Sequence, residues 1–164
     1  MQKLISKKDF KFYTMLKQII LDLELTNKEY WWLISDIEAY PNKKEYKEWI
    51  YKDYFVLLTT SELVKMINDD DFQWVWAVFS VIPLKYKKED ILKYDLPYCY
   101  SYFDQEYNPF DDNPKIQHPL AEFELYAVDS TYVFIVTEDV ELIERFKKCY
   151  PLFETKQSDG WIPI

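Results

Sequence analysis

The sequence predicts an α+β domain with a largely antiparallel sheet of about five strands and about four flanking helices. Apolar runs of strand length alternate with amphipathic stretches of helical length. The run FQWVWAVFSVI (Phe72–Ile82) is apolar on both alternating faces, as expected of a central strand that is covered on both sides. AEFELYAV and YVFIVT are separated by a short polar turn, which indicates an antiparallel hairpin.

The N-terminal part predicts a helix and then a strand. From Lys8 to Glu24, apolar residues recur at three- and four-residue spacing, which is typical of an amphipathic helix. The next segment, EYWWLISDIEAYP, predicts a strand with one face formed by Trp31, Leu33, Ile37 and Ala39 and the other by Trp32, Asp36 and Glu38. A helix is the alternative for this segment, because Thr26 and Glu29 have the spacing of a capping box.

The middle of the chain predicts a strand, a capped helix and a short helix. YFVLLT (Tyr54–Thr59) has the length and composition of a strand. Thr59 with Glu62 three residues later forms a second capping-box pattern, so a helix should follow directly. KEDILKY (Lys88–Tyr94) predicts a short helix.

The C-terminal hairpin should have one wet face, because Glu122 and Glu124 alternate with apolar residues. EDVELIERFKKCY then predicts a helix with acids in its first turn and lysines in its last, matching the helix dipole. We expect the tail GWIPI to fold back onto the domain. The two strand–threonine–helix stretches, residues 54–67 and 132–146, are either an internal repeat or two ordinary strand-to-helix junctions.

Length and composition predict a single globular domain spanning 1–164, able to bury roughly 70% of its unfolded surface. Gly160 is the only glycine, so the sequence cannot form the glycine-rich loops that cradle phosphates. With His118 as the only histidine, a zinc site based on histidines or a nucleophilic triad is disfavoured, and we expect no cofactor and no enzymatic activity. Cys99 and Cys149 are expected to be free thiols.

Charge and hydropathy indicate the compartment and the kind of partner. No apolar run approaches the length of a membrane span, so the sequence predicts a cytoplasmic protein without a membrane partner. The net charge is −9, and residues 53–164 hold 21 acidic against ten basic residues, a balance of −11. Such a surface repels nucleic acid and favours a basic protein partner. The oligomeric state is left open.

Three groups of ionisable residues are candidates for chemistry. The run Asp69–Asp71 is either a divalent metal site or a solvated helix end, and its consecutive spacing favours the latter. Asp36 and Glu38 share a strand face, which suits a solvent-facing edge, a partner-binding face or a metal-dependent enzyme. His118 is expected to be an ordinary loop histidine, because a Cys–His nucleophile would require a tertiary contact.

The segment LPYCYSYFDQEYNPFDDN (Leu96–Asn113) combines aromatic rings and carboxylates without a cation. It is either a loop pinned by its own aromatics, a surface for a basic partner, or a lid over a small-ligand site. The predicted partner-binding residues are Tyr98, Tyr100, Tyr102, Asp104, Glu106, Tyr107, Phe110, Asp111 and Asp112, with Trp32, Asp36 and Glu38 as a second candidate face.

In size, acidity and aromatic content, and in stretches such as EYWWLISDIEAYP and FQWVWAVFSVIP, the chain resembles the small immunity proteins of bacterial polymorphic toxin systems. AEFELYAVDSTYVFIVTEDVELIERF is similar to the C-terminal strand-turn-strand-helix of a family of uncharacterised small proteins from Gram-positive bacteria. The first resemblance implies an inhibitor that neutralises a cationic toxin, such as a nuclease. A small metal-dependent enzyme and a homo-oligomeric interaction module are the alternatives.

Overall fold

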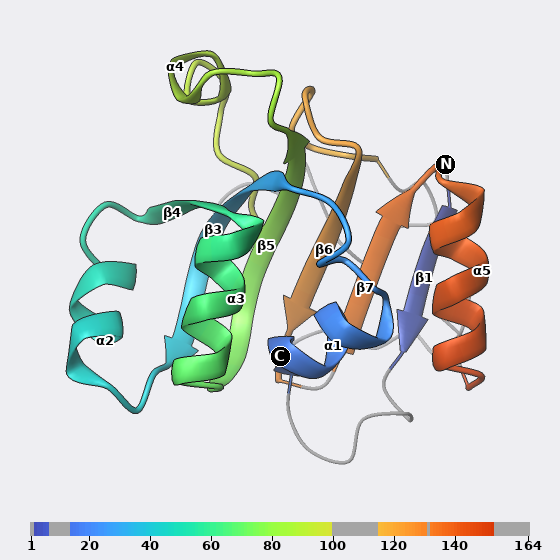
Figure 1. The fold of residues 1–164 in the computed structure, drawn as a ribbon, viewed down its shortest axis with the longest axis horizontal. Coiled ribbons are helices and arrows are strands. Elements are labelled where there is room, and N and C mark those ends of the chain that lie inside the picture. Colours follow the sequence, from blue (N-terminus) through green and yellow to red (C-terminus); the bar gives the residue numbers. More distant parts are fainter. Residues whose placement is uncertain (1, 7–13, 100–114, 131, 153–164) are drawn as a thin grey trace.

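The computed structural model describes residues 2–6, 14–99, 115–130 and 132–152, which form an antiparallel sheet with helices packed against it (Figure 1). The strands are β1 (Gln2–Ser6), β2 (Thr14–Met15), β3 (Tyr30–Tyr40), β4 (Phe55–Thr59), β5 (Gln73–Pro83), β6 (Phe123–Val128) and β7 (Tyr132–Thr137). The helices are α1 (Leu16–Asp22), α2 (Lys44–Ile50), α3 (Thr60–Asp69), α4 (Lys88–Ile91) and α5 (Val140–Cys149). The predicted α+β class with an antiparallel sheet is confirmed.

The sheet has the strand order β1-β7-β6-β5-β3-β4, and the two-residue β2 pairs with β5. Strand β5 is central, as its doubly apolar sequence predicted, and pairs with β3 on one side and β6 on the other. Strands β6 and β7 form the predicted hairpin, and Asp129 and Ser130 in its turn adopt left-handed φ angles of 51° and 57°.

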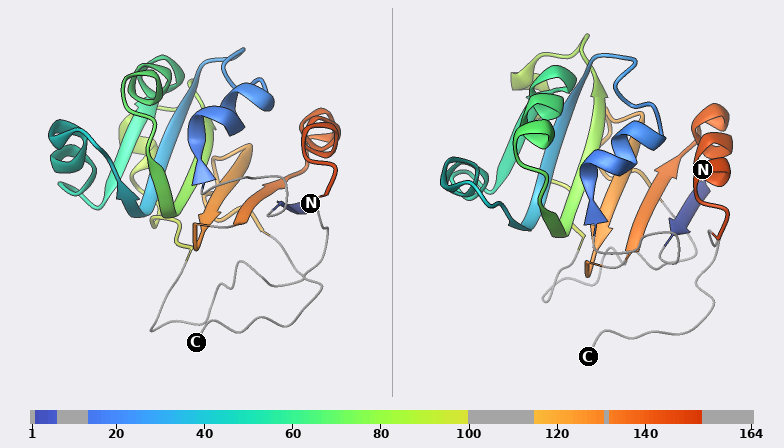
Figure 2. Two further views of the ribbon diagram at one scale, coloured as in Figure 1. Left: turned by 90° about the horizontal axis from the view of Figure 1, so that it is seen from below. Right: turned by 60° about the horizontal axis from the view of Figure 1, so that its bottom comes forward.

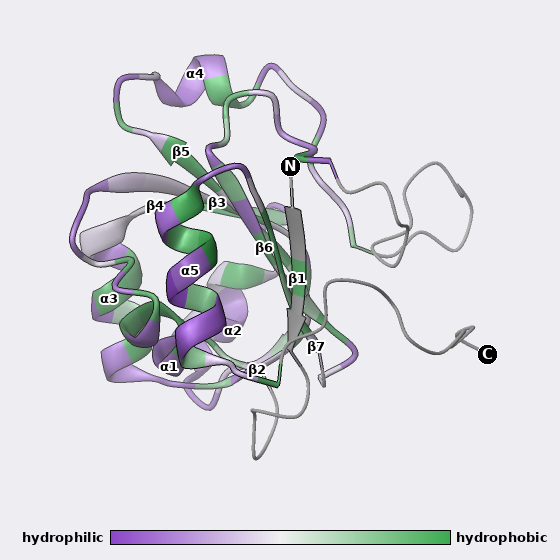
Figure 3. Ribbon diagram, turned by 90° about the vertical axis from the view of Figure 1, so that its right-hand side faces the viewer, coloured by the Kyte–Doolittle hydropathy of each residue, from purple (hydrophilic) through white to green (hydrophobic). Residues whose placement is uncertain are grey.

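One face of the sheet, here called the helical face, packs against α1, α3 and α5 (Figure 2). Both α3 and α5 carry one apolar side and one polar side, and Figure 3 shows this mixture along α5. Their buried residues join the strands in the largest apolar core, whose bulkiest members include Trp32, Trp74, Phe79 and Phe146. This core is the main hydrophobic contribution to stability.

The opposite face, here called the connection face, is covered by the described parts of the connection between β5 and β6, residues 84–99 and 115–122. Two smaller clusters lie there, one around Tyr126 and Phe134 and the other around Leu33, Ile82 and Ile91 of α4. The sheet is therefore buried on both sides in its centre, with helices on one side and mostly irregular chain on the other.

Local signals explain where several elements begin. At α3, the Thr59 hydroxyl accepts the Glu62 N–H and the Glu62 carboxylate accepts the Thr59 N–H, so the predicted capping box is confirmed. Helix α5 begins after Asp139, whose carboxylate accepts the N–H groups of Glu141 and Leu142. The two strand-to-helix stretches thus start their helices with different caps, and their origin as a repeat stays open.

The structure corrects several predicted elements. Residues 30–40 form a strand, so the helical alternative is wrong, and Glu29 instead accepts a hydrogen bond from the Ser61 hydroxyl. Helix α1 begins only at Leu16, because residues 14–15 pair with β5. Strand β1 and helix α2 were not predicted, and the tail GWIPI lies outside the described residues. No helix in the described ranges is long and apolar enough to cross a membrane.

Candidate functional site

Strand β3 contains a bulge at Asp36 that organises the candidate site. The β3–β5 register shifts between Ser35 and Ala39, and Asp36 adopts a left-handed φ of 50°. Aspartate tolerates this conformation better than bulkier residues, and an extra residue in one strand redirects the side chains around it. Ala39 was predicted to lie on the strand face opposite Trp32. Beyond the bulge it instead packs in the same apolar core as Trp32.

The bulge holds the chain that follows α4. The Ser35 hydroxyl donates to the Pro97 carbonyl at 2.6 Å, and the Asp36 carboxylate accepts the Cys99 N–H at 2.6 Å. Two consecutive residues of β3 therefore fix residues 97–99 against the connection face. This arrangement brings Asp36 and Tyr98, which are predicted from separate segments, to one site.

A groove of about 350 Å³ opens beside this bulge and is here called the bulge groove. Its walls come from β3, the end of α2 and the chain after α4, and it is lined by Asp36, Ile37, Ile50, Tyr51, Tyr54, Leu96, Pro97 and Tyr98. The wall formed by Tyr51 is fixed, because its hydroxyl donates to the Ala39 carbonyl at 2.7 Å and accepts the Ala39 N–H at 3.1 Å. The groove thus combines a rigid aromatic wall with one carboxylate.

Tyr54 is the most unusual residue of the bulge groove. Its φ of 61° is left-handed, which for a bulky side chain costs roughly 1–2 kcal/mol relative to an extended backbone. Its side chain is 86% exposed, so burial of the ring does not offset that strain. Backbone strain that the packing of the fold does not explain occurs frequently at functional sites. Tyr54 is therefore the strongest single indication that this groove is a binding site.

Three exposed acidic residues are close in sequence to residues that line the groove. Glu38 is exposed just beyond the bulge and accepts a hydrogen bond from the Tyr40 hydroxyl at 3.0 Å, which raises the pKa of that phenol. Asp53 and Asp95, sequence neighbours of the lining residues Tyr54 and Leu96, are exposed. Lys52 and Lys93 are the cations in these two stretches of sequence, and Lys93 pairs with Asp90.

The predicted partner-binding residues have different outcomes. Asp36 and Tyr98 line the groove, and Glu38 is exposed but is not one of the lining residues. Trp32 is 0% exposed, and its indole N–H donates to the Thr60 hydroxyl inside the core. The prediction that Trp32 contacts a partner is therefore wrong. The others lie outside the described residues: Tyr100, Tyr102, Asp104, Glu106, Tyr107, Phe110, Asp111 and Asp112.

The sequence did not predict Tyr51, Tyr54 or Leu96 as site residues. Their roles arise where α2, β3 and the chain after α4 meet, and these three segments are far apart in sequence. The repeated exposed tyrosines in YKDY (residues 51–54) were the available signal, since large aromatic side chains at a loop surface are typical of contact sites.

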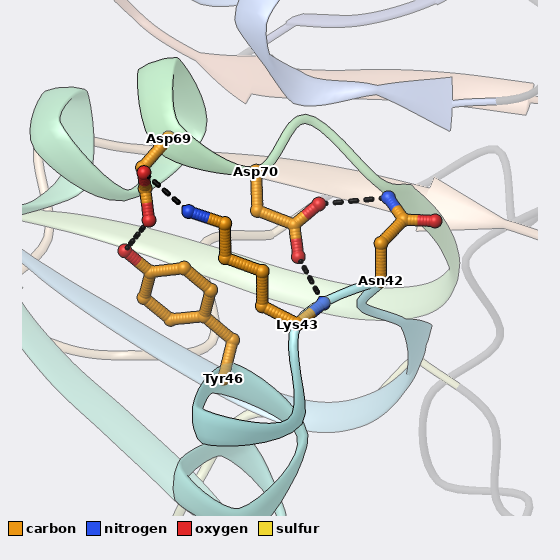
Figure 4. Close-up of polar contacts among 5 residues, drawn as sticks. All are labelled: Asn42, Lys43, Tyr46, Asp69 and Asp70. Carbon is orange, nitrogen blue, oxygen red and sulfur yellow. Dashed lines mark hydrogen bonds and ion pairs between the residues drawn. The ribbon is translucent and has the colours of Figure 1, made fainter.

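The acidic run at the end of α3 forms structural contacts (Figure 4). Asp69 pairs with Lys43 at 2.5 Å and accepts the Tyr46 hydroxyl at 2.9 Å, and both hydrogen bonds lower the pKa of its carboxyl. Asp70 is buried and accepts the Asn42 side-chain N–H at 2.7 Å and the Lys43 backbone N–H at 2.8 Å. These contacts tie the start of α2 to the end of α3.

The expectation of a solvated helix end is therefore wrong for Asp70, which is 6% exposed. Asp71 is half-buried, and burial raises the pKa of its carboxyl. Among the described residues, no group of three or more histidine, cysteine, aspartate or glutamate side chains is arranged to hold a metal ion.

The connection face contains a buried carboxylate that the sequence placed in water. Glu124 is 0% exposed, so the prediction of a wet face there is wrong. Its two oxygens accept hydrogen bonds from the Ser80 hydroxyl, the Tyr126 hydroxyl and the backbone N–H groups of Gln117 and His118, at 2.5–2.9 Å. Four donors explain why a carboxylate is tolerated at this depth.

His118 belongs to the same arrangement and lies in a loop, as expected, but its side chain is fully buried. Its Nδ1 accepts the Leu120 N–H at 3.2 Å, which leaves Nε2 to donate to the Ile91 carbonyl at 3.1 Å. Burial lowers the pKa of the imidazole. Both ring nitrogens thus hold the connection in place.

Both cysteines are free thiols, as predicted. Cys99 is buried, its thiol faces the Ala127 carbonyl, and burial raises its pKa well above the usual value. Burial also raises the pKa of the Cys149 thiol. Neither thiol is set up as an activated nucleophile, because reactive cysteines have lowered pKa values.

A smaller pocket of about 190 Å³ lies between α1, α5 and the start of β3. Its charged lining residues carry both signs, and Arg145 is engaged with the Leu23 carbonyl and with Glu24. The bulge groove is larger and more aromatic, and it contains the strained Tyr54.

Comparison with protein-family models found no matching family, and comparisons with curated proteins and with solved structures found no similar protein. The resemblances drawn from the sequence therefore stay predictions. The bulge groove is the basis for inferring function.

Proposed function

We propose that this protein is a non-catalytic inhibitor that binds and neutralises a cationic protein toxin, such as a nuclease, in the bacterial cytoplasm. The bulge groove is part of the contact surface. The observation that carries this proposal is Tyr54, an 86% exposed aromatic residue on a left-handed backbone that lines the same groove as the Asp36 carboxylate. Strain of this kind is retained when a side chain must be presented in one direction.

The composition of the groove supports a protein partner. Tyrosine provides a large contact area with few rotatable bonds, and it is enriched at protein interfaces. The net charge of −9 and the exposed carboxylates near the groove would attract a basic protein and speed its association. The aromatic and acidic segment 100–113, whose residues are predicted to contact the partner, follows Tyr98 and Cys99 directly in the sequence.

Binding to the product of the neighbouring gene tests the proposal. Purified protein should bind that product, and cells that express the toxin should grow only when this protein is present. Replacing Asp104, Glu106, Asp111 and Asp112 with their amides should slow association and flatten its salt dependence. The proposal is wrong if the gene product does not bind and cells without this protein grow normally while expressing it.

Substitution of Tyr54 is the sharper test, because it separates binding from folding. Tyr54→Gly removes the ring and relieves the left-handed strain, so the folded protein should be at least as stable as the wild type. Binding should weaken by about tenfold or more if Tyr54 is an anchor residue. Tyr54→Phe keeps the ring and is the matched control. Unchanged affinity in Tyr54→Gly would remove the groove from the interface.

A further inference from the structure

Strand β4 forms an edge of the sheet. In the described part of the chain it pairs with β3 alone, over residues 31–35. The second half of β3 has no pairing with β4. There the Tyr51 hydroxyl, at the end of α2, forms hydrogen bonds with the N–H and the C=O of Ala39. The outer edge of β4 therefore begins where the bulge groove ends, at Tyr54.

Hydrogen bonds near the end of β4 show which of its backbone groups face outward. The Tyr30 N–H donates to the Thr60 hydroxyl, on the β4 side of β3. Backbone direction alternates along a strand, so Trp32 also faces β4 and meets Leu58. The same alternation directs the N–H and C=O groups of Leu57 and Phe55 to the outer edge. At Thr59, the next outward position, the N–H is accepted by the Glu62 carboxylate.

The sequence of β4 lacks the usual protection of an edge strand. Exposed edges are commonly blocked by lysine, by proline or by an inward-pointing charge, because unpaired backbone groups recruit further strands. FVLLT contains no proline and no charge. Val56 and Leu58 pack in the helical-face core, which holds the strand flat and in register.

We infer that an extended segment of a basic protein partner adds to β4 as a further strand and places a lysine or arginine side chain in the bulge groove. This inference rests on the proposed function. Main-chain hydrogen bonds to Leu57 and Phe55 provide the pairing, as in other cases of strand addition. In the groove, the Asp36 carboxylate and the rings of Tyr51 and Tyr54 suit a cationic group.

Charge argues against a second copy of this chain as the occupant. Two chains with a net charge of −9 each repel one another, whereas a basic segment is attracted by the acidic surroundings of the groove.

The deciding variant is Leu57→Pro, which removes the outward N–H and leaves the hydrogen bonds of Val56 and Leu58 to β3 in place. Proline is tolerated at an edge when its missing N–H faces outward. Leu57→Ala is the matched control, since it removes similar side-chain packing but keeps the N–H. Both variants should show the circular dichroism spectrum of the folded protein.

The probe is an acetylated and amidated decapeptide of alternating valine and arginine, and its binding is followed by NMR and calorimetry. The wild type should bind it, with the amides of Phe55 and Leu57 newly protected from hydrogen exchange. Leu57→Pro should weaken binding about tenfold, and Leu57→Ala less than about threefold, since strand addition depends on main-chain pairing. A peptide with glutamate in place of arginine should not bind.

The inference is overturned if Leu57→Pro and Leu57→Ala bind the peptide equally, or if the new protection lies on another element. It is also overturned if light scattering shows a wild-type dimer that Leu57→Pro abolishes, because β4 would then pair with a second copy. Failure of this inference is separable from failure of the proposed function: loss of toxin binding in Tyr54→Gly with full binding in Leu57→Pro rejects only the strand addition.

Discussion

On β6, Leu125 and Glu124 are neighbours in sequence but lie on opposite faces of the sheet, and both are almost completely buried. Leu125 packs among apolar side chains beneath regular helices. Glu124 lies beneath an irregular connection and accepts four hydrogen bonds, two of them from that connection's backbone. The helical face thus excludes water by apolar packing, and the connection face adds directional polar contacts.

This difference follows from what covers each face. A helix satisfies its own backbone and can present a continuous apolar side, whereas an irregular segment has backbone N–H groups that need partners when buried. Glu124 supplies such partners, and near the bulge groove Asp36 accepts the Cys99 N–H while the Ser35 hydroxyl donates to the Pro97 carbonyl. The proposed binding site is therefore shaped by polar anchors of the connection.

The largest expected effect comes from removing the central anchor. Glu124→Leu should destabilise the fold by about 4 kcal/mol, because four buried donors lose their acceptor and each unsatisfied donor costs about 1–3 kcal/mol. Leu125→Met, on the opposite face of the same strand, should cost less than about 1.5 kcal/mol. Urea unfolding of both variants measures the difference. A Glu124→Leu variant as stable as the Leu125→Met variant would contradict the contrast between the two faces.

The next expected effect is a pH dependence of folding stability that is caused by His118 on the connection face. Burial lowers the pKa of His118, so the folded state favours the neutral imidazole. The unfolded state takes up a proton near the ordinary pKa of about 6.5, so the His118 contribution to stability is present above that pH and is lost as the pH falls from there through the lower pKa of the folded state. Glu124 and the Tyr94 ring are its neighbours there.

Urea unfolding at pH 7, 6 and 5 should show stability falling by up to about 1.4 kcal/mol per pH unit from this one proton. In His118→Gln, the fall in stability due to the histidine proton should be absent, and the fall due to protonation of carboxyl groups should remain. Parallel pH profiles for the two proteins would show that His118 does not titrate on unfolding.

The helical face was more predictable from sequence than the connection face, for physical reasons. Its elements carry local signals, such as the Thr59–Glu62 capping box and the acid-to-lysine gradient of α5. A doubly apolar run identified β5 as central. Period-two alternation placed Glu124 in water, because alternation shows which side chains share a face but not what covers that face.

The candidate site was predictable only in part. Asp36 and Tyr98 were named from separate segments, and it is the bulge that brings them together. A left-handed aspartate inside a strand has no local signature, so the reversal of faces after Asp36 was missed and Trp32 was assigned to the surface. The left-handed backbone of Tyr54 likewise depends on how the chain runs from α2 to β4, and no local sequence pattern indicates it.

A smaller effect tests whether buried carboxylates anchor irregular chain elsewhere in the molecule. Asp70→Ala should cost about 2 kcal/mol, since it leaves the buried contacts to Asn42 and Lys43 unmade. Asp69→Ala should cost less than about 1 kcal/mol, because its pair with Lys43 is exposed to solvent. Thermal unfolding measures the stability that each variant loses. Equal losses of stability would show that burial does not determine how strongly these contacts stabilise the fold.

The smallest effect concerns the helical face, where local signals suffice. Thr59→Ala removes the side-chain acceptor of the α3 capping box and should cost about 1 kcal/mol, whereas Thr59→Ser should retain most of that contribution. Hydrogen exchange then separates the two faces: in Thr59→Ala the amides of the first turn of α3 should exchange faster, while those of Gln117 and His118 stay protected by Glu124. Faster exchange at Gln117 and His118 would mean that the helical face and the connection are stabilised as one cooperative unit, because the hydrogen bonds of the cap join Thr59 and Glu62 within the first turn of α3.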